Sequence, residues 1–420
     1  MNRTPVSLAA RQGTLREHNL ALVARAVFES PAPRSRADLS VVTGLTRATV
    51  SVLVDQLVDA EILRELPPLA PQRAGRPAVP LTPAARSIVG LGLEVNVDYL
   101  GGRVVDLTGA VVAERVTPGD FHASDPADVL ARLGTLARDL LAEVDAQGMR
   151  VAGARLALPG LVDARAGRLQ VAPNLGWSEL DPVPLLGLDP GLRFDVANEA
   201  KLAGLAQSAL AHGGPPVPSD PAPGAPPLPD DGARPGPSSY LYVSGDVGIG
   251  SAIVIDRQLF LGRHGWSGEI GHVVVDPHGP RCPCGATGCL EQYAGKDALL
   301  RAAGLGVDAQ VADLVAALDA GDARATAAAA RAGSALGSAL ADFMNLVDID
   351  TVLLGGIYPD LLPYLRAPLL TGLRTRVLAA PWAEFEVSAA LVGSYAAMTG
   401  GARLVLRDVL AHPADWVTPV

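Results

Sequence analysis

The sequence has few cysteines, few lysines and no long apolar run. Only three cysteines occur in 420 residues, which argues against a fold held together by disulfides. No apolar run reaches the roughly 18 to 20 residues that a membrane-spanning helix needs. The first residues lack the apolar core and cleavage site of a secretion signal. Lys201 and Lys296 are the only lysines, a bias typical of a GC-rich genome. We therefore expect a cytoplasmic protein with no membrane segment.

The composition is that of a folded protein with an uneven distribution of charge. Hydrophobic residues make up 49% of the chain and charged residues 19%, which excludes a disordered protein. A chain of 420 residues has room for two or three domains. Residues 1–90 hold 11 arginines against 7 acidic residues, whereas the whole chain has a net charge of −10. A basic segment at the front of an acidic body favours a polyanionic partner there.

The N-terminal segment has the pattern of a winged helix-turn-helix. Apolar residues recur at helical spacing over 14–29, and two shorter helices joined by a glycine turn are predicted over 36–44 and 45–63. Strand-like segments over 62–66 and 77–82 flank a polar loop, as the two strands of a β-wing would. A helical cap without a ligand is the alternative interpretation.

The start of the predicted second short helix carries side chains suited to DNA. Short polar donors there have the length to contact base edges and phosphates in a major groove. Arginines at the tip of the predicted wing suit a narrow minor groove, where negative potential is concentrated. The candidate DNA-binding residues are Arg36, Thr46, Arg47, Thr49, Ser51, Arg73 and Arg76.

The rest of the chain predicts an α/β body of two lobes. Apolar strand-like runs alternate with helical segments, including a helix over 198–211 and an Ala-rich helical stretch over 308–345. The Pro- and Gly-rich segment 212–239 is expected to be a mobile surface insertion, with a docking peptide as the alternative. We therefore divide the chain into residues 1–85 and residues 86–420.

Three cysteines within eight residues indicate a metal site. Cys282, Cys284 and Cys289 offer thiolates, which suit zinc, and a histidine would complete a tetrahedral set. We favour His272 over His278, because His278 lies in a predicted flexible turn. Four protein ligands would close the site, so the zinc is expected to be structural. Free or buried thiols without a metal are the alternative.

Taken together, these motifs resemble those of the ROK family (repressor, open reading frame, kinase), in particular its xylose- and N-acetylglucosamine-repressor-like branch. The most specific match is Glu-x-Gly-His followed by Cys-x-Cys-Gly-x-x-Gly-Cys-x-Glu, present as residues 269–272 and 282–291. Supporting matches are LPGLVD (158–163), APNLGW (172–177), VANEAKLAGLA (196–206), GDVGIG (245–250) and LLGG (353–356). The resemblance implies a two-lobed, actin-like (ribonuclease-H-like) sugar kinase fold with sugar bound between the lobes.

The same resemblance implies specific roles for residues of this chain. Zinc would be bound by His272, Cys282, Cys284 and Cys289. Sugar hydroxyls would be bound by Asn174, Asn198, Glu199, Glu269, His272 and Glu291. Carboxylates and amides meet hydroxyls with directional hydrogen bonds, which makes the set chemically reasonable.

The sequence departs from the kinases of this family where nucleotide phosphates would bind. Glu94 and Asn96 stand in the place of a Gly-Gly-Thr element, and Asp246 lies in the second phosphate loop. The kinase catalytic base is an Asp, and here the matching residue is Glu199, whose extra methylene displaces the carboxylate by about an ångström. We therefore expect that kinase activity has been lost.

The leading functional hypothesis is a transcriptional repressor that binds operator DNA as a homodimer or tetramer. A monosaccharide in the cleft between the lobes would release it or modulate its binding. An ATP-dependent sugar kinase with an added DNA-binding domain is the alternative hypothesis. A third is a repressor that responds to a protein partner and has a vestigial cleft.

Overall fold

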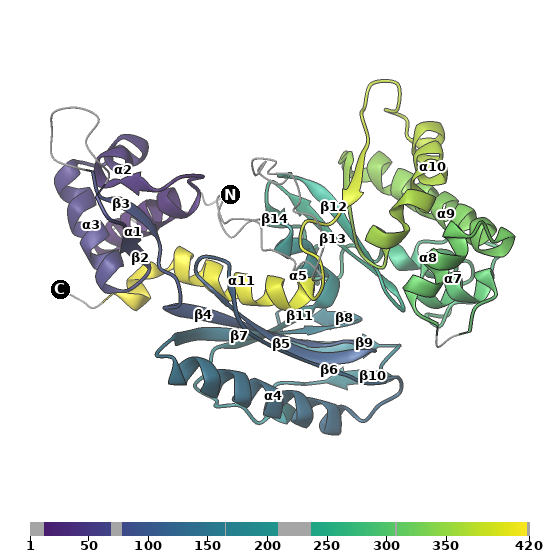
Figure 1. The fold of residues 1–420 in the computed structure, drawn as a ribbon, viewed down its shortest axis with the longest axis horizontal. Coiled ribbons are helices and arrows are strands. Elements are labelled where there is room, and N and C mark those ends of the chain that lie inside the picture. Colours follow the sequence, from purple (N-terminus) through teal and green to yellow (C-terminus); the bar gives the residue numbers. More distant parts are fainter. Residues whose placement is uncertain (1–11, 69–77, 164, 209–236, 307–308, 418–420) are drawn as a thin grey trace, which may run out of the picture.

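The computed structural model describes residues 12–68, 78–163, 165–208, 237–306 and 309–417. Figure 1 shows three parts: a helical N-terminal domain, a first lobe built on a sheet covered by one long helix, and a second lobe rich in helices. Most of the predicted insertion lies outside the described residues.

The N-terminal domain combines three helices with a small antiparallel sheet of order β1-β3-β2. Its elements are α1 (Gln12–Phe28), β1 (Arg34–Ser35), α2 (Arg36–Thr43), α3 (Arg47–Asp59), β2 (Leu63–Glu65) and β3 (Pro80–Pro83). Gly44 ends α2 with φ of 71°, a conformation that favours glycine, and the Thr46 side chain accepts a hydrogen bond from the Thr49 N–H to cap α3. The helices and the two predicted strands therefore lie in the expected order, and β1 adds a strand that the sequence did not indicate.

Lobe 1 is a five-stranded sheet of order β11-β7-β4-β5-β6 with α4 against it. Its main elements are β4 (Ile88–Val95), β5 (Tyr99–Asp106), β6 (Val111–Pro118), α4 (Pro126–Ala146), β7 (Arg150–Leu158) and β11 (Phe194–Asn198). A second small sheet is formed by β8 (Leu161–Asp163), β9 (Arg168–Ala172) and β10 (Trp177–Leu180), and it is followed by the 3₁₀ helix η1 (Pro184–Leu186). The central strands β4 and β7 are almost wholly buried, as expected for a sheet that is covered on both faces.

Lobe 2 repeats the same sheet order with β14-β13-β12-β15-β16. Its elements are β12 (Tyr240–Gly245), β13 (Ile249–Ile255), β14 (Gln258–Leu259), η2 (Ile270–His272), α6 (Glu291–Ala294), α7 (Lys296–Ala303), α8 (Val311–Asp319), α9 (Ala323–Val347), β15 (Thr351–Gly356), α10 (Tyr358–Arg376) and β16 (Glu386–Ala389). In both sheets the first strand pairs antiparallel with the second and parallel with a later one.

The Ala-rich helical stretch predicted over 308–345 consists of two helices, because the chain breaks between α8 and α9. Gly321 has φ of 72°, and the Asp322 side chain accepts hydrogen bonds from the N–H groups of Arg324 and Ala325. The helix predicted over 198–211 is α5 (Glu199–Ala206), shorter at its C-terminal end.

Two helices join the three parts. α5 packs against β13 and β12 of lobe 2, and α11 (Ala396–Ala411) packs on α5 and on β4, β7 and β5 of lobe 1. Figure 1 shows α11 running from the centre of the molecule to the N-terminal domain. There α1 contacts α11 and the 3₁₀ helix η3 (Pro413–Trp416), so one apolar core is shared by the N-terminal domain and α11.

Among the described residues no single helix is long and apolar enough to cross a membrane. The pair α2 and α3, bent by 116°, passes that test by length and composition.

Candidate functional site

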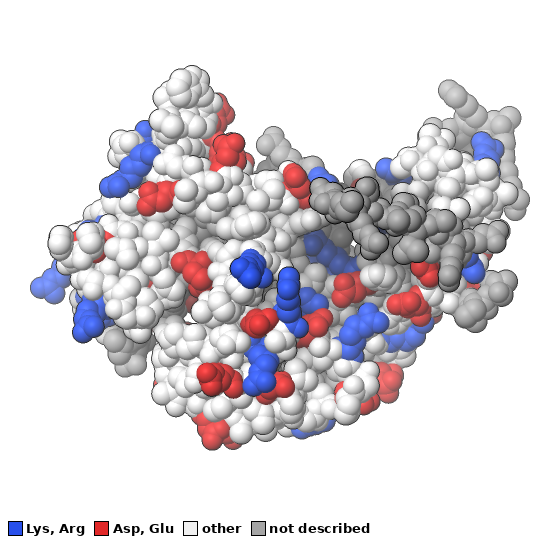
Figure 2. Space-filling view, turned by 180° about the vertical axis from the view of Figure 1, so that it is seen from behind, with Lys and Arg blue, Asp and Glu red and all other residues white. Residues whose placement is uncertain are grey.

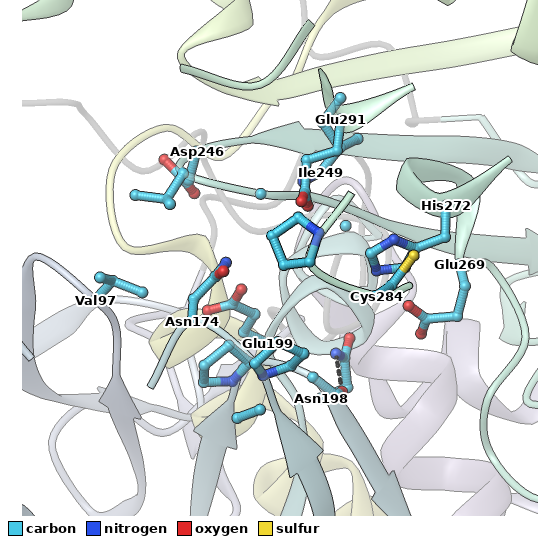
Figure 3. Close-up of a pocket in the computed structure, with 18 of the residues that line it drawn as sticks. Val97, Asn174, Asn198, Glu199, Asp246, Ile249, Glu269, His272, Cys284 and Glu291 are labelled. Atoms are coloured by element: carbon cyan, nitrogen blue, oxygen red, sulfur yellow. Dashed lines mark hydrogen bonds between the residues drawn. The ribbon is translucent and has the colours of Figure 1, made fainter. Parts of the chain in front are cut away.

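A cavity between the two lobes brings all six predicted sugar-binding residues together. It encloses about 790 Å³, a volume that includes the open solvent at its mouth. Figure 3 shows Asn174, Asn198 and Glu199 on one side of the cavity and Glu291 on the other. Glu269 and His272 lie at one end, and the described lining contains no Lys or Arg. Sugar binding by these residues stays a prediction.

The start of α5 positions two of these side chains. Asn198 is the N-cap of α5. Its side-chain Oδ1 accepts a hydrogen bond from the Lys201 backbone N–H at 3.1 Å, and its side-chain Nδ2 donates to the Gly160 carbonyl oxygen at 2.8 Å. These two bonds fix the orientation of the amide. Glu199 is the first residue of α5, and its enclosed Oε2 has no hydrogen-bond partner among the described residues. A ligand hydroxyl in the cavity would satisfy that oxygen.

Lobe 2 supplies the facing carboxylates. Glu291 begins α6, and its Oε2 accepts from the Ile249 N–H at 3.3 Å. A Cβ on Gly248 would lie 2.6 Å from Glu291 Oε2 and 3.4 Å from Asn174 Nδ2, so only glycine leaves the space between these groups open. Glu269 precedes the short η2 helix, which carries His272 at its end.

Two more carboxyl groups lie close to the cavity. Burial raises the pKa of Asp246, which lines it, to about 7, and burial likewise raises the pKa of Glu94 behind it to about 7. The Tyr99 hydroxyl donates to Glu94, whose Oε2 is without a partner among the described residues. Burial also raises the pKa of Glu199, and the neighbouring Glu94 and Asp246 raise it further. When these carboxyl groups ionise, this end of the cavity therefore carries a concentrated negative charge.

Both lysines of the chain lie beside this cavity. Lys201 Nζ is 3.7 Å from Glu269 Oε1, and Lys296 Nζ is 2.6 Å from Asp98 Oδ2. The second pair joins the β4–β5 turn of lobe 1 to the start of α7 in lobe 2. Sequence reasoning attributed the two lysines to composition alone. Their rarity among 34 basic residues was the signal that could have pointed to these positions.

The three cysteines and His272 form a compact cluster. All four ligand atoms lie within 4.8 Å of one another, with Cys284 Sγ 3.7 Å from Cys289 Sγ and Cys282 Sγ 3.8 Å from His272 Nδ1. A tetrahedral ion with Zn–S bonds of about 2.3 Å needs S–S separations of roughly 3.8 Å. The cluster is thus compatible with a structural zinc site, and it includes His272 rather than His278.

The backbone around the cysteines is built to bring them together. Two bridges, Val274 to Cys289 and Arg281 to Thr287, close the segment into a tight antiparallel loop. Gly288 has φ of 77°, and a Cβ there would lie 1.6 Å from the Asp276 carbonyl oxygen. Because His272 lines the cavity while its Nδ1 faces the thiols, the cluster fixes one wall of the cavity.

In the N-terminal domain, some of the predicted DNA-binding side chains already form ion pairs or hydrogen bonds within the protein. The Arg36 guanidinium forms ion pairs with Asp55 of α3 and Glu65 of β2. The hydroxyls of Thr46 and Thr49 lie 2.9 Å apart and contact each other.

Other members of the predicted DNA-binding set are exposed or lie outside the described part of the chain. Arg47 is exposed and Ser51 is half-buried, whereas Arg73 and Arg76 lie outside the described residues. Ala48 and Val52 of α3 are exposed apolar residues that were not among the predicted DNA-binding residues.

Comparison with known proteins finds a match to the ROK family in the second half of the chain. The profile of the ROK family matches residues 230–408. The chain is 27% identical to the xylose repressor of Bacillus subtilis over 292 residues, 70% of this chain and 69% of that repressor. It is similar to the crystal structure of a ROK family transcriptional regulator described as a homologue of the E. coli MLC protein. That likeness has a TM-score of 0.74 at 27% identity and covers 95% of this chain and 97% of the other.

A kinase structure shares the fold of the lobes. The ROK family glucokinase from Streptomyces griseus matches with a TM-score of 0.59 at 23% identity, over 75% of this chain and 98% of its own. The expected two-lobed, actin-like α/β fold is thereby confirmed. The chain thus carries a ROK family domain over residues 230–408, and it is similar to a ROK family transcriptional regulator over almost its whole length.

Proposed function

We propose that this protein is a sugar-responsive transcriptional repressor that binds operator DNA. One observation carries the proposal: a cavity lined by carboxyl and amide side chains and a domain with helix-turn-helix order lie in one chain, linked by α11. The likeness to proteins named xylose repressor and ROK family transcriptional regulator supports it.

The cavity suits an uncharged monosaccharide. Carboxylates of Glu199, Glu269 and Glu291 accept from hydroxyl groups, and the Asn174 amide can both donate and accept. Charge-assisted bonds of this kind are strong and directional, so an epimer that leaves one carboxylate unpaired should bind poorly. Asp246 lines the same cavity and would repel the phosphate of a phosphorylated sugar.

Phosphoryl transfer is less well supported than binding. Glu94, Glu199 and Asp246 place three enclosed carboxyl groups near where nucleotide phosphates bind in the family's kinases. Burial raises the pKa values of all three groups, and a triphosphate would add negative charge to the same region. Loss of kinase activity is therefore part of the proposal.

The cysteine cluster is proposed to bind zinc as a structural ion. The separations of the ligand atoms suit a tetrahedral ion, and four protein ligands would close the coordination sphere. When bound, zinc would tie the loop that carries Glu291 to η2, which carries His272. The residues that face the sugar would then be held in fixed positions.

The route from cavity to DNA is proposed to run through α5 and α11. Asn198 and Glu199 start α5, which packs on α11, and α11 shares a core with α1. A sugar that binds better to one arrangement of the lobes would favour that arrangement, and with it one position of the N-terminal domain. The equilibrium would shift by the coupling free energy, typically about 1–3 kcal/mol. In a homodimer, such a shift changes the spacing of two DNA-reading helices.

The test is a DNA-binding assay in the presence of sugars. DNA bound by the full chain is first selected from a random pool, and its affinity is then measured by fluorescence anisotropy with a panel of monosaccharides. We expect one sugar to change the affinity roughly 5- to 150-fold, and Glu291→Gln to abolish that response without abolishing DNA binding. An unchanged affinity with every sugar would contradict sugar control.

The kinase alternative makes an opposite prediction. Incubation of the chain with ATP, magnesium and the same sugars would then give phosphorylated sugar at enzymatic rates. The proposal expects no product above the background without protein. Turnover that is abolished by Glu199→Gln would favour the kinase.

A further inference from the structure

The exposed side of α3 carries an apolar strip that the proposed function leaves unexplained. Val52 is 56% exposed, and Ala48, one helical turn before it, is also exposed. The opposite side of α3 is buried, with Val50, Leu53 and Val54 each at most 4% exposed. Residues four apart lie on the same face of a helix, so Ala48 and Val52 form one strip. Figure 1 places α3 at the end of the molecule farthest from α7 to α10.

We infer that Val52, together with Ala48, reads thymine methyl groups in the major groove of the operator. This inference rests on the proposed DNA binding and names the base feature that the helix recognises. The thymine C5-methyl is the apolar group among the base edges of a major groove, and small apolar side chains contact it directly.

The polar candidates on α3 are partly committed elsewhere. The Thr46 and Thr49 hydroxyls contact each other at 2.9 Å, and the Thr46 oxygen also accepts from the Thr49 N–H at 3.2 Å to cap the helix. Their capacity to bond base edges is therefore reduced. Arg47 and Ser51 remain as polar groups beside the apolar strip, so contacts to methyl groups carry a larger share of the readout.

The carboxylate of Asp55, which neighbours Val52 on α3, is bound in an ion pair. Asp55 lies one turn after Val52 and would repel DNA phosphates, but its carboxylate is paired with Arg36, which also pairs with Glu65. Arg36 thus acts as a positioning residue for α3 and offsets part of the negative charge next to the strip. The apolar strip can then approach the groove without an unpaired carboxylate beside it.

The experiment removes single methyl groups from the DNA. In a duplex selected by the full chain from a random pool, each thymine is replaced in turn by deoxyuridine, which lacks only the methyl group. We expect one or two positions per half-site at which the wild type loses affinity about fourfold, the equivalent of one buried methyl. Val52→Ala should bind the thymine duplex more weakly and lose the sensitivity at one of those positions.

The control is Val41→Ala on α2, where the side chain is 84% exposed and lies outside α3. It should keep the wild-type sensitivity at every position. The inference is overturned if no thymine position is sensitive in the wild type, or if Val52→Ala keeps the full sensitivity. Failure to select any DNA would instead overturn the proposed function, and the inference with it.

Discussion

Glu94 shows how a buried carboxyl is tolerated beside a ligand cavity. It is 3% exposed and hydrogen-bonded by the Tyr99 hydroxyl, with Asp246 and Glu199 close enough to influence its charge. Ionising a carboxyl in such surroundings is costly, so the proton stays on to higher pH than in the unfolded chain. Glu94 is therefore a source of pH dependence in the stability of the folded chain.

Replacement of Glu94 tests the free-energy cost of ionising this buried carboxyl group. Burial raises the pKa of Glu94 from 4.5 to about 7 in the folded state, so the folded chain holds a proton that the unfolded chain releases. The stabilisation is complete below pH 4.5 and is lost as the pH rises to about 7, with an upper limit of about 3 kcal/mol. Glu94→Gln does not titrate, so its stability relative to the wild type should rise between pH 5 and pH 8. Urea unfolding at both pH values measures this.

The matched control for that experiment is Glu384→Gln, which removes an exposed carboxyl. Its pH dependence should follow the wild type. Equal pH dependence of Glu94→Gln and the wild type would show that Glu94 is not the titrating group.

His272 and His278 allow the metal proposal to be tested by a single side chain. His272 Nδ1 faces the thiols, whereas His278 is exposed and lies outside the cluster. We expect elemental analysis to find one zinc per chain in the wild type and in His278→Ala, and none in His272→Ala. A chelator should lower Tm of the first two proteins and leave His272→Ala unchanged. Equal zinc content in both variants would contradict the assignment.

At the scale of elements, α11 is held against its neighbours by glycines. A Cβ on Gly400 would lie 1.8 Å from the Leu202 carbonyl oxygen of α5, and one on Gly92 would lie 1.8 Å from the Met398 carbonyl oxygen. Backbone atoms cannot move aside as flexible side chains do. These contacts therefore set the distances between α11, α5 and β4.

Two adjacent glycines of α11 provide a matched pair. Gly400→Ala forces α5 and α11 apart and should destabilise the protein by about 3 kcal/mol. At Gly401 the nearest atom to a new Cβ is 3.4 Å away, and alanine is favoured over glycine within a helix by about 0.5–1 kcal/mol. Gly401→Ala should thus be neutral or stabilising. Chemical denaturation measures both, and equal effects would contradict the packing described for Gly400.

Local signals in the sequence predicted the elements well, and long-range packing could not be predicted. Thr46 and Gly44 mark helix ends through their own backbone, and Cys282, Cys284 and Cys289 are close in sequence, so short spacing was enough to indicate the metal cluster. The contact of α11 with α5 and with the N-terminal domain joins segments about 200 to 400 residues apart. Nothing in their periodicity shows which face meets which partner.

The ion pair between the two lobes could not be predicted either, because its two residues are far apart in the sequence. Lys296 and Asp98 are 198 residues apart in the chain and meet at 2.6 Å. Burial in the cavity also depends on both lobes, so the raised pKa values of Glu94 and Asp246 have no counterpart in the local sequence. The six candidate sugar-binding residues came from a family resemblance, and the structure places all six around one cavity.

On the scale of the whole molecule, charge and apolar surface are distributed unevenly. Figure 2 shows basic and acidic side chains intermixed over lobe 1 on the face seen there, with few charges over lobe 2. The basic excess of residues 1–90 is a property of the sequence, because four of its 11 arginines lie outside the described residues. A polyanion would be attracted to that end of the chain, which agrees with the proposed placement of DNA.

The three parts of the molecule are not independent, because α11 completes the core of the N-terminal domain. Leu406 and Val409 of α11 are at most 1% exposed and belong to the same apolar cluster as Leu20 of α1 and Leu53 of α3. The domain expected to span residues 1–85 thus depends on a helix from the far end of the chain. Stability of the DNA-reading helices is therefore tied to the lobe that carries part of the sugar cavity.

Two leucine truncations, one in the core shared with α11 and one in the core of lobe 2, can show whether the N-terminal domain depends on α11. They separate that dependence from a general loss of stability. Leu406→Ala in the shared core and Leu373→Ala in the core of lobe 2 each remove a fully buried side chain and should each cost about 2–5 kcal/mol. Hydrogen exchange followed by mass spectrometry should show lost protection in α1 to α3 for Leu406→Ala, and in α9 and α10 for Leu373→Ala. If α1 to α3 keep wild-type protection in Leu406→Ala, the N-terminal domain is stable by itself, and α11 cannot transmit the state of the cavity through this core.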